Sequence, residues 1–196
     1  MRDKRNRLSL GAVMVGLGLM IGVMGRMGNR ALIQAQVVQE ATEAGEAEEM
    51  VVMDKMQEAG GVDYYLSYPG ILPDHPLYWL KMIRDRVQLW LTTKPLAKAE
   101  KLLLYADKRL GAGWALIEGN KVELGVTTLT KGEKYLERAM IETTRFEEGG
   151  DEMRFKEKLG KAVMKHEEVL LLLEEKLGDE HKGVMEQMLE MIKKGK

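Results

Sequence analysis

The stretch "PLAKAEKLLLYADKRLGAGWALIEGNKVELGVTTL", residues 95–129, predicts a helical hairpin. Pro95 suits the first turn of a helix, and apolar side chains then recur every three or four positions. These side chains are Leu96, Ala99, Leu103, Ala106, Leu110, Trp114 and Ile117. Gly119 and Asn120 form a C-terminal stop before a second apolar stripe begins. Because so short a connection reverses the chain, we expect the two helices to be antiparallel neighbours.

The same helical period recurs before and after this hairpin, and no segment shows the strict alternation typical of a half-buried strand. We therefore expect an all-α fold, an antiparallel bundle of four to five long amphipathic helices. The expected helices span about 76–92, 95–118, 121–147, 151–177 and 180–193. The side chains expected to face the core from the first helix are Leu77, Leu80, Ile83, Val87 and Trp90. Those expected inward from the last helix are Val184, Met188 and Ile192.

The segment ahead of the first helix is rich in proline. Pro69, Pro73 and Pro76 fix their own backbone angles and hold the preceding residues in extended forms. We expect an extended strip at 64–75, which opens a helical domain at 64–196. Aromatic residues gather here, and they either pack on the protein's own helices or bind a partner. The interaction candidates are Tyr65, Tyr68, Tyr78, Trp79 and Trp90.

The N-terminus predicts a membrane segment. Four basic residues precede an uncharged run at 8–25, which as a helix would be roughly 27 Å long, just enough to span a bilayer core. Residues 1–25 are a signal anchor or a cleaved signal peptide, and the poor cleavage sites favour the anchor. The basic N-terminus predicts a single-pass protein of the cell membrane with the helical domain extracytoplasmic. If the segment is cleaved, the domain is secreted.

Gly18 and Gly22 within the apolar run have the spacing that lets two membrane helices approach closely. This spacing would allow a homo-oligomer, although a glycine-rich run meets it by chance, and we favour chance. Residues 26–63 follow as an acidic tether that could be helical. Its part at 40–63 carries eight acids and one lysine, a composition typical of a solvated segment.

One part of the sequence resembles a bacterial family of unknown function. Members open with Pro-Gly-x-Leu-Pro-Asp-x-Pro-Leu-Tyr-x-Leu-Lys, which matches residues 69–81, and the resemblance extends over about 64–145. The resemblance implies charged amphipathic helices behind an N-terminal signal or anchor, in an extracytoplasmic domain. It implies no activity and no catalytic residue.

Composition and motifs argue against most catalytic, thiolate-metal and nucleic-acid-binding sites. The chain has no cysteine, which excludes disulfides and thiolate ligands, and a net charge of -1 argues against a nucleic-acid partner. The two serines and three histidines form no recognised catalytic motif, and no cofactor is implied. His166 lies on an apolar stripe, where a histidine is more often a hydrogen-bonded core residue than a ligand. We expect a protein that is not an enzyme.

Two functions remain open. The first is a membrane-tethered extracytoplasmic interaction or scaffold module that binds an unknown envelope protein. The alternative is an extracytoplasmic protein that binds Cu(I) through methionine triplets, because thioethers prefer soft metals. Methionine also fills irregular apolar surface, which is the simpler explanation and the one we favour. The candidate ligands are Met50, Met53, Met56, Met185, Met188, Met191 and His181.

Overall fold

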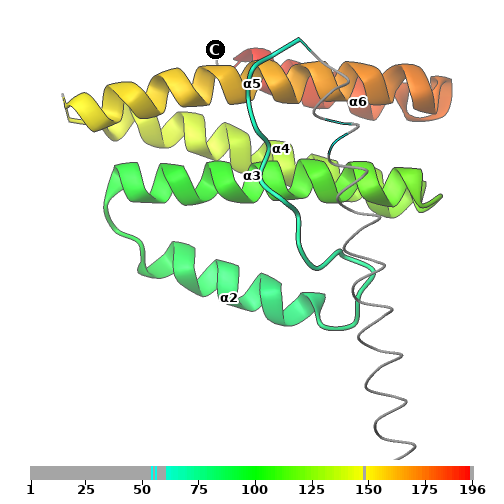
Figure 1. Cartoon of the computed structure of the whole chain (residues 1–196), viewed down its shortest axis with the longest axis horizontal. Coiled ribbons are helices and arrows are strands. Elements are labelled where there is room, and N and C mark those ends of the chain that lie inside the picture. The colour runs from blue at the N-terminus through cyan, green and yellow to red at the C-terminus, as the bar shows by residue number, and fades with distance from the viewer. Residues whose placement is uncertain (1–53, 55, 57–60, 148, 195–196) are drawn as a thin grey trace, which may run out of the picture. The chain divides into compact units, whose positions relative to one another are not determined.

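The computed structural model describes Asp54, Met56 and residues 61–147 and 149–194, all of which belong to a compact unit spanning Glu49–Lys196 (Figure 1). Every regular element among these residues is a helix and none is a strand, so the expectation of an all-helical fold is confirmed. The helices are α2 (Tyr78–Leu91), α3 (Pro95–Glu118), α4 (Val122–Glu142), the 3₁₀ turn η1 (Thr143–Arg145), α5 (Gly150–Leu177) and α6 (Asp179–Lys194).

The pairing of α3 with α4 is the most extensive in the fold. Between them the chain reverses at Gly119–Lys121, where Asn120 adopts the left-handed conformation with φ of 61°. The amide of Lys121 donates to the carbonyl of Leu116 at 2.8 Å, which satisfies a carbonyl that the helix end would leave unpaired. Asparagine tolerates this backbone conformation better than most residues, so the turn fits its sequence.

Glycines let α3 and α4 approach each other closely. A Cβ atom at Gly125 would lie 2.6 Å from Cγ1 of Ile117 and 2.9 Å from the carbonyl oxygen of Gly113. A Cβ atom at Gly113 would likewise lie 2.5 Å from Cδ2 of Leu129. Because a side chain at Gly125 would meet backbone, the crossing depends on its absence.

The core lies between the α3–α4 pair and the α5–α6 pair, with α5 packed on α3 and α6 on α4 (Figure 1). It buries the apolar stripes of these four helices, as their period predicts. Met56 also joins this core. Two details differ from expectation: α4 ends at Glu142 and is followed by η1, and Val184 of α6 is exposed while Met188 and Ile192 are buried.

Residues 61–77 contain no helix or strand, with turns only in their last part, and they connect three helices. Near their start, the amide of Gly61 donates to Oε1 of Glu168 on α5 at 2.5 Å. Tyr64 then contacts α3, and the segment finally turns into α2 (Figure 1). We call residues 61–77 the crossing segment. It passes from α5 over α3 and leads to α2, which lies on the other side of α3.

Several expectations concern residues outside the described part of the chain. These are the apolar run at 8–25 with Gly18 and Gly22, most of the acidic tether, and two methionines, Met50 and Met53. In the part that the structure describes, no helix combines the length and hydropathy needed to cross a bilayer.

Candidate functional site

Helix α2 shows its apolar side to solvent. The expectation that this side faces the core is wrong: its members are all exposed, namely Leu77, Leu80, Ile83, Val87 and Trp90. Trp79, Met82 and Leu91 are exposed as well. We call this surface the outward face of α2 and define it by Trp79, Leu80, Met82, Ile83, Val87, Trp90 and Leu91. So many exposed large apolar side chains on one helix are typical of an interaction site.

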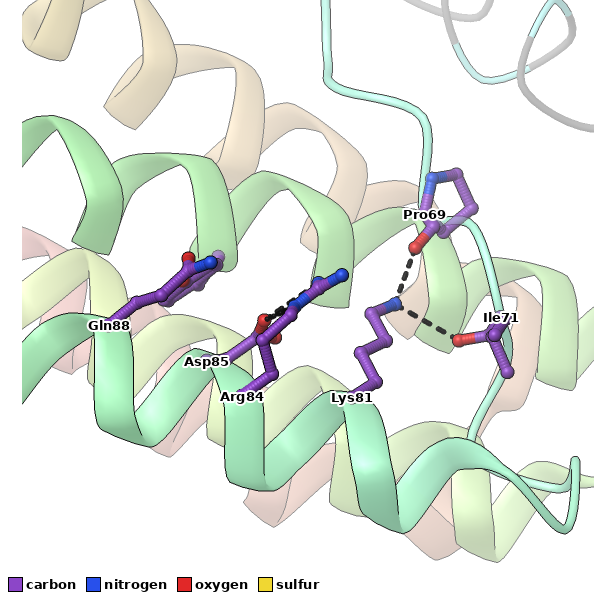
Figure 2. A network of polar contacts seen from close by, with 7 residues as sticks. Pro69, Ile71, Lys81, Arg84, Asp85 and Gln88 are labelled. Atoms are coloured by element: carbon purple, nitrogen blue, oxygen red, sulfur yellow. Dashed lines mark hydrogen bonds and ion pairs between the residues drawn. The ribbon is translucent and has the colours of Figure 1, made fainter.

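The polar side of α2 is the side that packs on the rest of the domain. Figure 2 shows Lys81 reaching the crossing segment, where its Nζ atom donates to the carbonyls of Pro69 at 2.6 Å and Ile71 at 3.0 Å. One turn further along, the buried Asp85 pairs with Arg84 at 2.8 Å. These contacts make much of the inner side of α2 polar, and Leu89 is the one apolar side chain that this helix buries in the core.

A further contact continues this inner side toward the end of α2. Oε1 of Gln88 accepts a hydrogen bond from the phenol of Tyr105 on α3 at 2.8 Å. Lys81, Asp85 and Gln88 are spaced as one helix side requires. Lys81 and Gln88 fix this side to the crossing segment and to α3, whereas Asp85 pairs with Arg84 of the same helix. Since α2 could bury its apolar side only by breaking these hydrogen bonds, the outward face stays outward.

Positive charge accumulates around the start of α2. Burial lowers the pKa of Lys81 to about 8, and the neighbouring cations Lys108 and Arg109 act in the same direction, against the opposite effect of Asp85. A pocket of about 570 Å³ opens beside it. The pocket is lined by apolar side chains and by three cations; the lining residues are Pro69, Gly70, Ile71, Leu77, Leu80, Lys81, Arg84 and Lys108. Because Leu80 belongs to both, the pocket adjoins the outward face.

A second polar cluster lies in the core and joins four segments of chain. Nδ1 of His166 on α5 lies 2.9 Å from Oε1 of Glu133 on α4, and its Nε2 lies 3.2 Å from Oδ1 of Asp107 on α3. The other carboxylate oxygen of Asp107 accepts from the hydroxyls of Tyr64 at 2.8 Å and Ser67 at 3.4 Å. We call these five residues the core network. They attach the crossing segment to three helices.

The charges of the core network determine the state of His166. Burial alone would lower its pKa, but the charge of Glu133 and the hydrogen bonds to Asp107 and Glu133 together raise the pKa to about 10. His166 is therefore an imidazolium that donates from both nitrogens at neutral pH. Burial and the charge of Asp107 raise the pKa of Tyr64, so its phenol stays protonated and donates.

The sequence pattern predicts one member of this network, His166, and the other four were not predicted. His166 is 0% exposed and hydrogen-bonded, as its position on an apolar stripe predicts. Asp107 and Glu133 were overlooked, although each also falls at a stripe position, between leucines spaced three or four residues away on either side. An acidic residue within an apolar stripe predicts a buried carboxylate, and a buried carboxylate predicts a partner, because burying an unpaired charge is costly.

The predicted interaction residues divide into two groups. Tyr65, Tyr68, Trp79 and Trp90 are exposed. Tyr78 is half-buried on the inner side of α2, with Lys81 Nζ 5.5 Å from its ring centroid. Only Trp79 and Trp90 lie on the outward face.

The candidate metal ligands that the structure describes are mostly in the core. Met56, Met185 and Met188 belong to the buried apolar cluster, and Met191 is half-buried. There they fill space between helices, which is a usual role of methionine. His181 lies beside carboxylates, with the ligand atoms of Glu123, Glu180 and His181 all within 4.8 Å of one another. Both carboxylates are exposed, and such a group is common without a metal.

Comparison with known proteins gives a family and no activity. Residues 70–180 match a family model described as "Domain of unknown function (DUF5667)". The matched region covers the end of the crossing segment, α2 to α5 and the first residues of α6. It therefore includes the outward face and, of the core network, the three helical members. No curated protein and no solved structure matches the chain.

Proposed function

The chain belongs to the DUF5667 family of unknown function, and we propose that it is a membrane-tethered extracytoplasmic interaction module whose docking surface is the outward face of α2. The observation that carries this proposal is the orientation of α2. Its inner side is held by hydrogen bonds, and its apolar side is open to solvent along the whole helix. Exposed apolar surface of this extent is unfavourable unless something covers it.

The sequence of the N-terminal segment and tether supports an extracytoplasmic location for the module. The apolar run at 8–25 has the length of a membrane span, and the basic residues before it favour a cytoplasmic N-terminus. Residues 26–63 would then connect the span to the helical domain on the other side of the membrane.

A binding role fits the placement of the titratable groups better than a catalytic one. His166 and Glu133 are both fully buried, so a substrate would have to open the core to reach them. Their charges are directed at each other and at Asp107, as in a structural cluster. We therefore propose a non-enzymatic module.

Site-specific photo-crosslinking of the full chain in intact bacterial cells tests the docking surface. A photoreactive amino acid replaces Ile83 of the outward face, which is 53% exposed, or Leu171 of α5, which is 51% exposed. The two positions thus present similar apolar side chains on different helices. Adducts that form from position 83 and not from position 171 are expected. Equal labelling from both positions, or no adduct with protein or lipid from either, contradicts the proposal.

The extracytoplasmic location is tested separately, by labelling a single introduced cysteine, because the chain has no cysteine of its own. A single cysteine at the exposed Glu157 position (Glu157→Cys) should react with a membrane-impermeant maleimide in intact cells. Protection until the cells are lysed would place the domain in the cytoplasm and refute the extracytoplasmic assignment.

A further inference from the structure

The outward face of α2 has the composition of a helix that lies in a membrane surface. Such helices place tryptophan and aliphatic side chains on one side, with lysine and arginine at its borders. Trp79 and Trp90 stand near the two ends of α2, and Ile83 and Val87 lie between them. Tryptophan is the residue that favours the boundary between headgroups and acyl chains.

Basic residues border this face. Helical geometry puts Arg86 along one edge, next to Trp79 and Trp90, and Arg84 along the other, next to Leu80 and Leu91. Both arginines are exposed, and Arg84 forms an ion pair with Asp85, the single acid of α2, which is buried. The surface that α2 presents outward is therefore apolar and cationic.

The adjoining pocket extends the same chemistry. Lys108 of α3 and Arg84 of α2 stand at its rim, and Leu77, Leu80 and Ile71 supply its apolar lining. A phospholipid offers the complementary groups, a phosphate for the cations and acyl chains for the apolar side chains. Tryptophan and arginine are common at protein interfaces too, but lysine is depleted there, so Lys108 at the pocket favours a lipid over a protein partner.

We propose that α2 docks in the plane of an anionic membrane surface, with its outward face at the headgroup boundary and lipid phosphates paired to Arg86 and Lys108. This rests on the proposed function and names its partner as lipid. The tether keeps the domain within reach of the bilayer, which raises the effective concentration of lipid.

The three tryptophans of the chain provide the experiment. Trp79 and Trp90 lie on α2, whereas Trp114 is buried in α3. The full chain is reconstituted into vesicles of brominated phosphatidylcholine, with or without about a third of phosphatidylglycerol. Bromine quenches only the tryptophans that it contacts. We expect strong quenching in the anionic vesicles, with loss of quenching at high salt because exposed charges are screened.

The variant Trp79→Phe/Trp90→Phe serves as the control, since only Trp114 remains and its emission should not be quenched. A charge-removal pair tests the basic border. Arg86→Gln/Lys108→Gln should reduce the ratio of docked to undocked protein roughly fivefold per cation, because each basic residue near an anionic surface contributes about 1 kcal/mol. Lys158→Gln/Lys161→Gln, which removes two exposed cations of α5, should leave quenching unchanged.

Each other outcome contradicts the proposal in its own way. Equal quenching in purely zwitterionic vesicles overturns the assignment to anionic lipid. Unquenched tryptophans together with a protein adduct from position 83 overturn the lipid partner but leave the interaction module standing. Tryptophan emission that is already blue-shifted in detergent, and insensitive to lipid, identifies a second copy or the N-terminal segment as the occupant. Absence of both lipid contact and adducts refutes the proposed function itself.

Discussion

The hydroxyl of Tyr64 donates a hydrogen bond of 2.8 Å to Oδ2 of Asp107, across 43 residues of chain. The same carboxylate binds His166 through its other oxygen. Asp107 therefore links the crossing segment to the charged centre of the bundle. Since the crossing segment has no helix or strand of its own, side-chain contacts of this kind hold it in place.

Replacement of Tyr64 by phenylalanine should destabilise the domain. The substitution keeps the ring but removes the 2.8 Å hydrogen bond to Oδ2 of Asp107, which retains the longer contact to Ser67. Loss of one partner of a buried charged group costs about 1–3 kcal/mol. Urea denaturation measures the change, and proteolysis should accelerate within the crossing segment. The neighbouring Tyr65→Phe is the control: this tyrosine is 83% exposed, so its substitution should change stability by less than about 0.5 kcal/mol.

Stability should decrease as the pH rises above neutrality. The pKa of His166 is raised from 6.5 to about 10 in the folded protein, so its contribution is complete below about pH 6.5 and is lost as the pH rises toward 10. Burial lowers the pKa of Lys81 from 10.5 to about 8, so this group adds stability as the pH rises through 8. Between pH 6.5 and 8 the loss from His166 is the larger of the two effects.

Over that interval we expect a loss on the order of 2 kcal/mol, since one pH unit corresponds to about 1.4 kcal/mol for a fully linked proton. Urea denaturation at pH 6.5, 7.2 and 8 measures the slope. His166→Gln should flatten it, because glutamine retains hydrogen-bonding capacity but does not titrate. His75→Gln changes an exposed histidine outside the core network, so the slope of stability against pH should stay the same. A slope that survives in the His166 variant would assign the effect to another group.

The crossing of α3 and α4 should not accept a side chain at Gly125. In Gly125→Ala the new Cβ would meet the carbonyl of Gly113 at 2.9 Å, and backbone cannot move aside as a side chain can. Overpacking of this kind costs about 1–3 kcal/mol. Gly160→Ala is the matched control in α5, where nothing lies within 4 Å of the added atom. There, helix propensity predicts a gain of about 0.5–1 kcal/mol. The midpoint of thermal unfolding should fall for Gly125→Ala and rise for Gly160→Ala.

Substitutions on α2 should separate stability from binding. Ile83→Glu places a charge on the outward face and should change the free energy of unfolding by less than about 0.5 kcal/mol, because the side chain is exposed. It should abolish the quenching of α2 tryptophans by brominated lipid. Leu103→Ala in the core should cost about 2–5 kcal/mol by leaving a cavity. If Ile83→Glu unfolds the domain, α2 packs through its apolar side and the proposed docking surface does not exist.

The local sequence was sufficient to predict the bounds of α3, one of the two helices that pair closely. Pro95 and the Gly119–Asn120 stop bound α3 at the residues expected, because start and stop signals act over a single turn. The end of α4 was expected too late, at 147. No glycine or proline interrupts the sequence between Glu142 and that point, so nothing local marks the change to η1.

For the functional surface, the sequence determined which residues share a side of α2, and the tertiary structure decided which way that side faces. Periodicity is a property of one helix, whereas burial depends on what the helix meets. The inner side of α2 is fixed by partners outside the helix, the carbonyls of Pro69 and Ile71 and the phenol of Tyr105. The core network has the same origin, since Tyr64, Asp107, Glu133 and His166 meet only after folding. A buried charge is stable only beside its counterpart, and that pairing exists only in three dimensions.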